Sequence, residues 1–394
     1  MADNPRVPTP DPTPSGRAPA LARRIAAAIE TAGGWLPFDR FMQEALYAPS
    51  LGYYAHGSPK FGQLARDGSD FVTGPELSPL FGQTLAVQLA EALRATGTDE
   101  LWEFGAGTGA LAEQVLGELS RVGQRVRRYT IVDVSGSLRA RQRERLAAYG
   151  ELVHWVDHLP PAMTGVVLGN EVLDAMPVQL LARTDGTWHE RGVVLKGKSN
   201  ASVDPQAGPA IDFNAVGFAW SDRPTSLRPP VEIEGRHDFV TEIHPQAEAF
   251  IRTLADRLRR GAAFFIDYGF PEAEYYHPQR HMGTLACHRA HRMDDDPLVD
   301  VGDKDITAHV DFTGIALAAQ DAGLQVLGYT GQGRFLLNCG ITERLQAVSL
   351  VESTPAVKLV AEHEMGELFK VIGLATGDGW AARGFAAGDR SHRL

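Results

Sequence analysis

The residues with the clearest chemical potential surround a glycine-rich turn at residues 101–111, LWEFGAGTGAL. Three glycines alternate within it, at Gly105, Gly107 and Gly109. Glycine lets the backbone turn tightly and approach a ligand closely, and the helix expected to begin near Ala110 would offer unpaired N–H groups to a polar ligand. The turn therefore predicts a bound nucleoside cofactor, although Gly105, Gly107 and Ala110 also fit the fingerprint of dinucleotide binders.

Acidic residues near this turn bear on the choice of cofactor. Glu103 lies just before the first glycine, where its carboxylate would repel a pyrophosphate but tolerate the cationic sulfonium and amino groups of S-adenosylmethionine. Asp133 ends the apolar stretch 129–132 and could accept the ribose hydroxyls of either cofactor. Asp157 follows VHWV, where it could bind the adenine amino group or lie on the surface as a loop acid. Glu103 thus favours S-adenosylmethionine over a dinucleotide.

The elements that would position these residues alternate between strands and helices from residue 100 onward. Apolar stretches predict strands at residues 101–104, 129–132, 152–156, 166–168 and 262–266. Helical periodicity lies between some of them, at residues 110–119 and 137–148. Residues 324–329 and 333–338 are expected to form a closing hairpin around a turn at 330–332. This alternation predicts an α/β fold with a parallel sheet flanked by helices.

Other segments suggest how the chain is divided. Helices are expected before the sheet, at residues 20–32, 37–46 and 78–94. We predict a disordered tail at 1–18, an N-terminal helical lid at 19–98, a core at 99–178 and 241–340, a β-rich insertion at 179–240, and C-terminal helices and a tail at 341–394.

Composition and charge narrow the class of protein. The formal net charge of −11 disfavours a protein that grips nucleic acid through its phosphates. No stretch approaches the roughly 18 apolar residues of a membrane span. The two cysteines imply no disulfide framework, and the N-terminus resembles neither a signal nor a transit peptide, so we expect a reducing, cytoplasmic location.

The sequence does not support a metal site, a hydrolase or a kinase, although some residues could suggest a metal site. Cys287, His288 and His291 suggest a metal, but a zinc site usually needs four ligands and no second pair stands at suitable spacing. The acids at 294–296 lack the pattern of a calcium loop, so no metal is expected. Neither a Gly-x-Ser-x-Gly elbow nor a P-loop is present, which argues against a hydrolase or a kinase.

Longer blocks of the chain resemble the MidA family, whose mitochondrial members assist the assembly of respiratory complex I. The blocks are ALYAPSLGYYAHG, SDFVTGPELSPLFGQ, LWEFGAGTGALA, GNEVLDAMPVQ, FFIDYGFP and DITAHVDF, spread over about residues 42–335. The resemblance implies a class I methyltransferase sheet with an antiparallel last strand, an N-terminal cover over the cofactor, and symmetric dimethylation of a protein arginine. Ser69 replaces a glycine that is usual in the family, which would alter the flexibility of the cover loop.

An arginine acceptor needs carboxylates that bind its protonated guanidinium and take a proton as the methyl group arrives. The best candidates lie in GNEVLDAMP, after the fourth expected strand, where parallel sheets bind ligands. We assign Asn170 to the cofactor and Glu171 and Asp174 to the acceptor, with a helix-capping role as the alternative for Asn170 and Asp174. Glu76, in TGPELSP, could reach the cofactor or acceptor from the lid, or belong to a helix cap around Ser78.

Asp267 and Tyr268 follow the fifth expected strand and could line the acceptor channel. Tyr268 could pack against a guanidinium face, although tyrosine also fills protein cores.

The sequence thus predicts an S-adenosylmethionine-dependent enzyme that methylates a protein arginine. A respiratory complex I subunit is a candidate substrate, and a homodimer is a candidate assembly. Methylation of a small molecule or of another side chain is one alternative. A partner-binding assembly factor in which catalysis is secondary is another.

Overall fold

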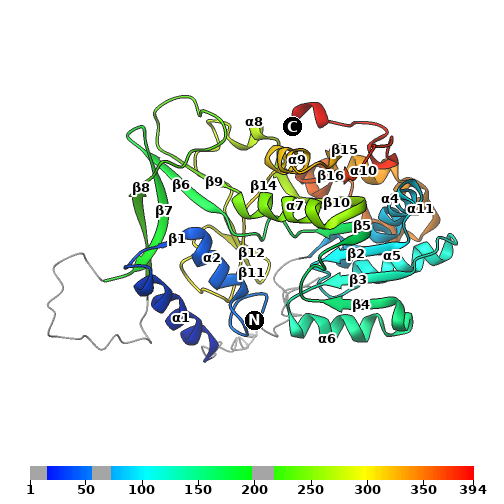
Figure 1. The fold of residues 1–394 in the computed structure, drawn as a ribbon, viewed down its shortest axis with the longest axis horizontal. Helices are drawn as coiled ribbons and strands as arrows, with labels where there is room; N and C mark the ends of the chain where they lie inside the picture. The colour runs from blue at the N-terminus through cyan, green and yellow to red at the C-terminus, as the bar shows by residue number, and fades with distance from the viewer. Residues whose placement is uncertain (1–15, 56–71, 198–216) are drawn as a thin grey trace, which may run out of the picture.

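An eight-stranded sheet forms the centre of the computed structural model, which describes residues 16–55, 72–197 and 217–394 (Figure 1). Its strand order is β15-β16-β10-β5-β2-β3-β4, with β14 paired to β10. The strands are β2 (Glu100–Phe104), β3 (Arg128–Val132), β4 (Val153–Val156), β5 (Met163–Asn170), β10 (Leu258–Phe270), β14 (Val310–Asp311), β15 (Gln325–Gly331) and β16 (Phe369–Ala375). Neighbouring strands are parallel except at β16, which is antiparallel to both β10 and β15. The predicted α/β fold with an antiparallel last strand is confirmed.

Helices cover both faces of this sheet because successive residues of a strand point to opposite sides. Leu101 of β2 belongs to an apolar cluster with residues of α4 (Leu80–Thr96) and α5 (Ala110–Arg121). Trp102, the next residue, belongs to a cluster with residues of α7 (Pro245–Arg257) and α9 (Phe312–Asp321). Strands β2 and β16 are buried along their whole length, as expected for strands covered on both faces.

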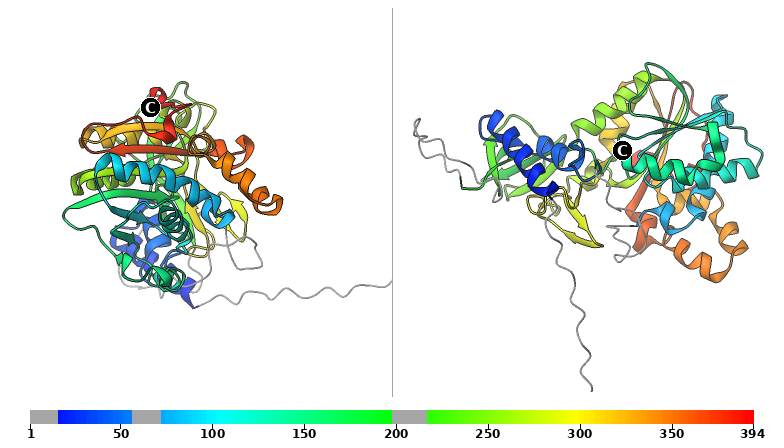
Figure 2. Two further views of the ribbon diagram at one scale, coloured as in Figure 1. Left: turned by 90° about the vertical axis from the view of Figure 1, so that its right-hand side faces the viewer. Right: turned by 90° about the horizontal axis from the view of Figure 1, so that it is seen from below.

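A second sheet joins the N-terminal segment to the region predicted as a β-rich insertion. Its order is β1-β7-β6-β9 with β8 on β7, and all pairs are antiparallel. The strands are β1 (Leu36–Pro37), β6 (Gln179–Thr184), β7 (Thr187–Leu195), β8 (Phe218–Pro224) and β9 (Phe239–Ile243). The helices α1 (Arg17–Thr31) and α2 (Phe38–Tyr47) share an apolar cluster with this sheet, and Figure 2 (right) shows them together on one side of the molecule.

A third, small sheet lies beside these two and has the order β12-β11-β13. Its strands are β11 (Ala286–Arg289), β12 (Arg292–Asp294) and β13 (Asp305–Thr307). The remaining α-helices are α3 (Gly74–Leu77), α6 (Gly136–Arg145), α8 (Glu272–Tyr275), α10 (Gln332–Asn338), α11 (Ile341–Ala347) and α12 (Leu350–Val357). In the part of the chain that the structure describes, no helix combines the length and apolarity needed to cross a membrane.

The predicted closing hairpin is wrong in its second half. Residues 325–331 form β15, but the next residues form helix α10, and the antiparallel partner of β15 is β16. A short apolar run does not distinguish a strand from a buried helix by periodicity, and Phe335 and Leu336 are buried on this helix. The core sheet therefore takes its last strand from within 341–394, which was predicted to hold only helices and a tail.

The two ends of the N-terminal region are only partly described. Helix α1 begins at Arg17, inside the segment 1–18 predicted as a tail, while residues 1–15 lie outside the described residues. Ser69 also lies outside them.

Candidate active site

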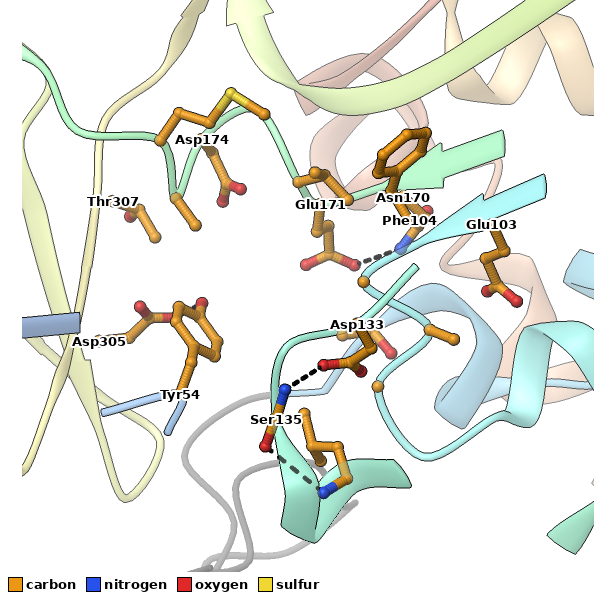
Figure 3. A pocket seen from close by; sticks show the side chains of 18 of the residues that line it. Tyr54, Glu103, Phe104, Asp133, Ser135, Asn170, Glu171, Asp174, Asp305 and Thr307 are labelled. Atoms are coloured by element: carbon orange, nitrogen blue, oxygen red, sulfur yellow. Dashed lines mark hydrogen bonds between the residues drawn. The ribbon is translucent and has the colours of Figure 1, made fainter. Parts of the chain in front are cut away.

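A cavity of about 710 Å³ opens at the carboxyl ends of the core strands. Phe104, Val132 and Asn170, which end β2, β3 and β5, all line it. Its far wall comes from the segment around α2 and from β13 (Figure 3). The cavity therefore lies where open parallel sheets bind ligands, and elements outside the core sheet complete it.

The glycine turn forms one end of this cavity. Gly105 and Gly107 line it with φ angles of 60° and 53°. A Cβ built on Gly105 would lie 3.2 Å from Cγ2 of Val172, so a side chain there would crowd the cavity as well as strain the backbone. Gly109 does not line the cavity; it precedes α5 with a φ of 85°, in the left-handed region. The turn thus presents bare backbone to a ligand.

Glu103 lies behind this turn and lines the cavity with only 2% of its surface exposed. Its Oε2 accepts a hydrogen bond from the Tyr129 hydroxyl at 2.7 Å. Burial raises the pKa of Glu103 to about 8, opposed by the Tyr129 hydrogen bond and assisted by the nearby Asp133 charge. A ligand cation would favour the ionised form of this carboxyl group.

Asp133 lies at the end of β3 and is fixed on both oxygens. Oδ1 accepts the Ser135 backbone N–H at 2.8 Å, which Figure 3 shows. Oδ2 accepts Nε2 of Gln142 at 2.7 Å. Gln142 also donates to the Gly107 carbonyl at 2.9 Å, so one side chain ties this acid to the glycine turn. Burial raises the pKa of Asp133. Gln142 could not be recognised from the sequence, because its role depends on the packing of α6.

Asp157 is not brought into the cavity. Its side chain is 65% exposed and pairs with Nδ1 of His158 at 2.5 Å. The sequence left open whether Asp157 binds the adenine amino group or lies on the surface as a loop acid. Its exposed position matches the surface acid.

The loop after β5 carries the two acids assigned to the acceptor, and both line the cavity. Glu171 has a φ of 54°, a conformation that a residue with a side chain rarely adopts, and its backbone N–H donates to the Ile266 carbonyl at 2.9 Å. Its Oε1 accepts Nδ2 of Asn170 at 2.9 Å. Burial and the Asp267 charge raise the pKa of Glu171 to about 8, while hydrogen bonds from Asn170 and the Gly74 backbone lower it.

Asp174 is the more deeply buried of the two, at 5% exposure. Its Oδ1 has no hydrogen-bond partner among the described residues. Burial, followed by the charges of Asp267, Glu171 and Asp305, holds the pKa of Asp174 well above its usual range. Neither Asp174 nor Asn170 caps a described helix. An unsatisfied buried oxygen in a cavity is a place for a ligand donor.

Asp267 has a different place from the one expected. It does not line the cavity; its Oδ2 accepts backbone N–H groups of the acceptor loop, from Val172, Leu173 and Asp174 at 3.0, 2.8 and 3.3 Å. Asp267 therefore fixes the backbone of the acceptor loop from outside the cavity. Tyr268 does line the cavity, and its ring packs on Phe369 with centroids 3.9 Å apart.

Glu76 lines the cavity from α3 and is engaged on the cofactor side. The Thr108 hydroxyl in the glycine turn donates to Glu76, and Nη1 of Arg145 lies 3.4 Å from the same Oε1. Glu76 thus ties the lid to the turn.

Five residues on the far wall were not predicted to line the cavity: Tyr47, Tyr54, His288, Asp305 and Thr307. Of these, His288 was named only as a possible metal ligand. The Tyr54 hydroxyl donates to Oδ2 of Asp305 at 2.7 Å, and Tyr47 stacks on Tyr54 with centroids 5.6 Å apart. A signal was available for four of them, because they lie in the blocks ALYAPSLGYYAHG and DITAHVDF. Nothing in their local pattern places them opposite Glu171.

The ionisable side chains that line the cavity are mainly acidic. Its described lining carries six carboxyl groups, Glu76, Glu103, Asp133, Glu171, Asp174 and Asp305. Among the described residues that line the cavity there is one histidine, His288, but no lysine or arginine. Such a cavity favours cationic ligands. Within residues 16–55, 72–197 and 217–394, no group of three or more His, Cys, Asp or Glu side chains is placed so that it could hold a metal ion.

The sheet order, the bare glycine turn and the fixed acid at the end of β3 define a class I methyltransferase. Residues 84–330 match the family model described as "Putative S-adenosyl-L-methionine-dependent methyltransferase". The chain belongs to this family, and within it to the MidA type that its sequence blocks resemble. It is an S-adenosylmethionine-dependent methyltransferase.

Individual relatives agree with this assignment. The chain is 28% identical to "Protein arginine methyltransferase NDUFAF7 homolog, mitochondrial" of Drosophila melanogaster, over 91% of this chain and 85% of that protein. It is 27% identical to "Protein arginine methyltransferase NDUFAF7, mitochondrial" of Homo sapiens, over 91% and 86%. A protein of Burkholderia thailandensis solved with S-adenosyl-homocysteine bound is 49% identical, with a TM-score of 0.89 over 99% of this chain and 100% of that one.

Proposed function

We propose that this methyltransferase acts on the guanidinium group of an arginine in a protein. The observation that carries the proposal is a set of three carboxyl groups that line the cavity, Glu171, Asp174 and Asp305. In Figure 3, Asp174 and Asp305 lie on the side of Glu171 that faces away from Glu103. Arginine is the one protein side chain that is both permanently cationic and able to donate along a planar fork. The names of the curated relatives, which are protein arginine methyltransferases, support the same substrate class.

On the donor side, we propose that Glu103, Gly105, Gly107, Asp133 and Asn170 hold the cofactor. S-adenosylmethionine supplies an electrophilic methyl group whose carbon–sulfur bond breaks with the electron pair left on sulfur. The bare backbone at Gly105 fits a bound nucleoside, because a Cβ would fill the space there. Gly109 contributes by starting α5 rather than by contact. Asp133 is suited to accept the ribose hydroxyls, because its oxygens are already oriented by Ser135 and Gln142.

On the acceptor side, we propose that Glu171 binds the guanidinium and accepts the proton that its nitrogen loses as the new carbon–nitrogen bond forms. The pKa of Glu171 is about 8 without a ligand, so a bound guanidinium would first favour its ionised form, and the high proton affinity of the site then suits a group that accepts a proton. Its backbone is fixed by the Ile266 carbonyl and its side chain by Asn170, so the carboxylate is held in place before the acceptor arrives.

We assign Asp174 a role as a buried counter-charge. Burial, followed by the charges of Asp267 and Glu171, holds the pKa of Asp174 well above its usual range when no ligand is bound. A guanidinium in the cavity would lower that pKa and give its unsatisfied Oδ1 a donor. Glu76 is placed to organise the glycine turn rather than to touch the acceptor, because Thr108 and Arg145 already occupy its carboxylate.

We further propose that the product is symmetric dimethylarginine and that the substrate is a subunit of respiratory complex I. Both rest on the family resemblance. A homodimer likewise stays a proposal.

The test is to identify the methylated residue. A lysate from cells lacking this protein is incubated with donor carrying a labelled methyl group and with purified enzyme, then hydrolysed and analysed for labelled amino acids. We expect label in symmetric dimethylarginine, and a loss of at least about a hundredfold for Glu171→Gln with S-adenosylhomocysteine binding retained. Glu144→Gln, an exposed acid on α6, serves as the matched control. Label in another amino acid, or only in small molecules, would show that the arginine assignment is wrong.

A further inference from the structure

We propose that Gln142 and Trp155 are positioning residues for the methyl donor, and that together they set the selectivity of the enzyme for the ribose diol. Trp155 anchors the side-chain amide of Gln142, and this amide joins Asp133 to the glycine turn. Neither side chain belongs to the described lining of the cavity, so both act through the groups that they hold. The inference rests on the proposed function, because it requires Asp133 to accept the ribose hydroxyls.

The first support is that both ends of the Gln142 amide have partners. Gln142 lies on α6 and is fully buried, with 0% of its surface exposed. Its Nε2 donates to the Gly107 carbonyl at 2.9 Å and to Oδ2 of Asp133 at 2.7 Å. At the other end of the amide, Oε1 accepts the indole N–H of Trp155 at 2.9 Å. The nitrogen of the amide is therefore directed at the donor site, and the oxygen is directed at β4.

The second support is that these three partners allow only one orientation of the amide. A backbone carbonyl and an ionised carboxylate only accept hydrogen bonds, whereas an indole N–H only donates. A flipped amide would place Oε1 against two acceptors and its NH2 group against the indole donor. Trp155 is the partner that lies outside the donor site. Without its N–H, Oε1 would be buried without a donor, which disfavours the present position of the amide.

The third support is the place of the two residues in the fold. Trp155 lies on the edge strand β4, and α6 runs alongside this strand (Figure 1). The same helix packs against the glycine turn, because a Cβ built on Gly109 would lie 3.5 Å from Cα of Gln142. A chain of contacts thus runs from β4 through α6 to the turn after β2 and to the acid after β3. It fixes the acid relative to the turn before a ligand arrives.

Ribose selectivity follows from the way in which the Asp133 carboxylate is held. Each oxygen of an ionised carboxylate can accept about two hydrogen bonds. Ser135 donates to Oδ1 and Gln142 to Oδ2, which leaves each oxygen with capacity for a ribose hydroxyl. Accepting both hydroxyls of a vicinal diol requires a fixed carboxylate plane, because rotation about the Cβ–Cγ bond would move one oxygen out of reach. Loss of the Gln142 bond removes one of these two restraints.

The experiment measures how strongly the enzyme selects the ribose diol. The probes are S-adenosylhomocysteine and its 2′,3′-dideoxy analogue, and calorimetry gives the affinity of each for the full-length protein. For the wild type we expect S-adenosylhomocysteine to bind about a hundredfold more tightly, since two hydroxyls donate to a charged acceptor.

Two variants test the two positioning residues. Gln142→Met keeps the length of the side chain and removes its hydrogen bonds, and it should lower the ratio of the two affinities about tenfold. Trp155→Phe removes only the indole N–H from this network and should lower the ratio about threefold. The affinity for the dideoxy analogue should stay within about threefold of the wild type in both variants. A merely structural defect would weaken both probes alike and leave the ratio unchanged.

Trp102→Phe is the matched control. Trp102 is a buried tryptophan of the same sheet, and its indole N–H donates to the Thr164 carbonyl at 2.9 Å. The change removes the same kind of hydrogen bond, but on the face of the sheet that packs against α7 and α9. Trp102→Phe should lower the melting temperature and keep the wild-type ratio. If Gln142→Met fails to fold, the comparison of Trp155→Phe with Trp102→Phe decides the matter.

The outcomes separate this inference from the function on which it rests. If Gln142→Met and Trp155→Phe keep the wild-type ratio while Asp133→Asn loses it, Asp133 binds the ribose without their help and the inference is wrong. An equal fall in the ratio for Trp102→Phe would also overturn it, because the effect would not depend on the Gln142 amide. If the wild type does not distinguish the two probes, or if Asp133→Asn keeps the ratio, the proposed role of Asp133 fails as well.

Discussion

The Tyr129 hydroxyl donates a hydrogen bond to Glu103, with 2.7 Å between the phenolic oxygen and Oε2, behind the glycine turn. Tyr129 belongs to β3 and Glu103 to β2, so two parallel neighbours fix one buried carboxyl group. The bond opposes the effect of burial, which otherwise drives the pKa of Glu103 upward. The balance between these two effects sets how the donor site responds to pH.

Donor affinity should depend on pH through Glu103. Its pKa of about 8 means that the carboxyl group is largely protonated at pH 6.5, whereas the ionised form attracts a cationic ligand. We expect the affinity for S-adenosylmethionine to rise about tenfold from pH 6.5 to pH 8, measured by calorimetry. Glu103→Gln should remove most of this rise, and Asp157→Asn, which changes an exposed acid outside the cavity, should preserve it. An equal rise in Glu103→Gln would assign the pH dependence to another group.

The stability of the ligand-free protein should fall as pH rises from about 6.5 to 8. Burial raises the pKa values of Glu103 and Glu171 to about 8 and of Asp267 to about 7, above those of an unfolded chain. In this window the folded state binds more protons than the unfolded state, so stability decreases with rising pH.

Histidines act in the opposite sense but at lower pH. Burial lowers the pKa of His244 to about 3 and of His309 to about 4, so their contribution to stability rises with pH until about one unit above the unfolded-state pKa, and it offsets a small part of the loss. We therefore expect a net loss on the order of 3 kcal/mol in unfolding free energy between pH 6.5 and 8, measured by urea denaturation. The loss should be smaller in Glu103→Gln. Constant or rising stability across this window would contradict the raised carboxyl pKa values.

Gly105→Ala should weaken donor binding by at least about tenfold. The new Cβ would lie 3.2 Å from Val172 at the cavity wall, and the φ of 60° disfavours a side chain. Gly123→Ala is the matched control, because its φ is 70° but no atom lies within 4 Å of the added Cβ. Both variants should lose comparable stability by thermal melting, whereas only Gly105→Ala should lose affinity for S-adenosylhomocysteine. Equal affinity in the two variants would show that the turn does not contact the cofactor.

Asp267→Ala should destabilise the fold and disorder the acceptor loop. The change leaves four backbone N–H groups without their acceptor: the buried ones of Leu173 and Asp174 and the partly buried ones of Val172 and Tyr268. We expect a loss of about 3 kcal/mol in unfolding free energy, since each unsatisfied buried donor is costly. Methyl transfer should fall more than donor affinity, because the glycine turn does not depend on Asp267. A loss of donor affinity as large as the loss of activity would argue against a role confined to the loop.

Local sequence patterns were sufficient to predict many of the strands of the core sheet. The strands around residues 101–104, 129–132, 166–168 and 262–266 were predictable because strands buried on both faces are nearly continuous apolar runs. The glycines before Ala110 and the acids at 103 and 133 follow the ends of such strands, and parallel strands bring their carboxyl ends to one edge. The donor side of the cavity could thus be derived from spacing along the chain.

Other features depended on contacts between distant segments. The last strand of the sheet lies at 369–375 and not at 333–338, because both runs are short and apolar and only packing decides which one joins β15. Asp267 lies within the last residues of β10 and Asp157 directly follows β4, yet the side chain of Asp267 binds a loop whereas that of Asp157 is exposed to water.

The acceptor wall shows the same limit most clearly. Asp305 and Tyr54 stand 251 residues apart, and their hydrogen bond exists only because the third sheet and the segment after α2 meet over the cavity. Residue spacing encodes the periodicity of single elements, whereas the approach of two such segments depends on how all the intervening elements pack. The sequence was therefore informative about the methyl donor, and the tertiary structure decided which side chains face it.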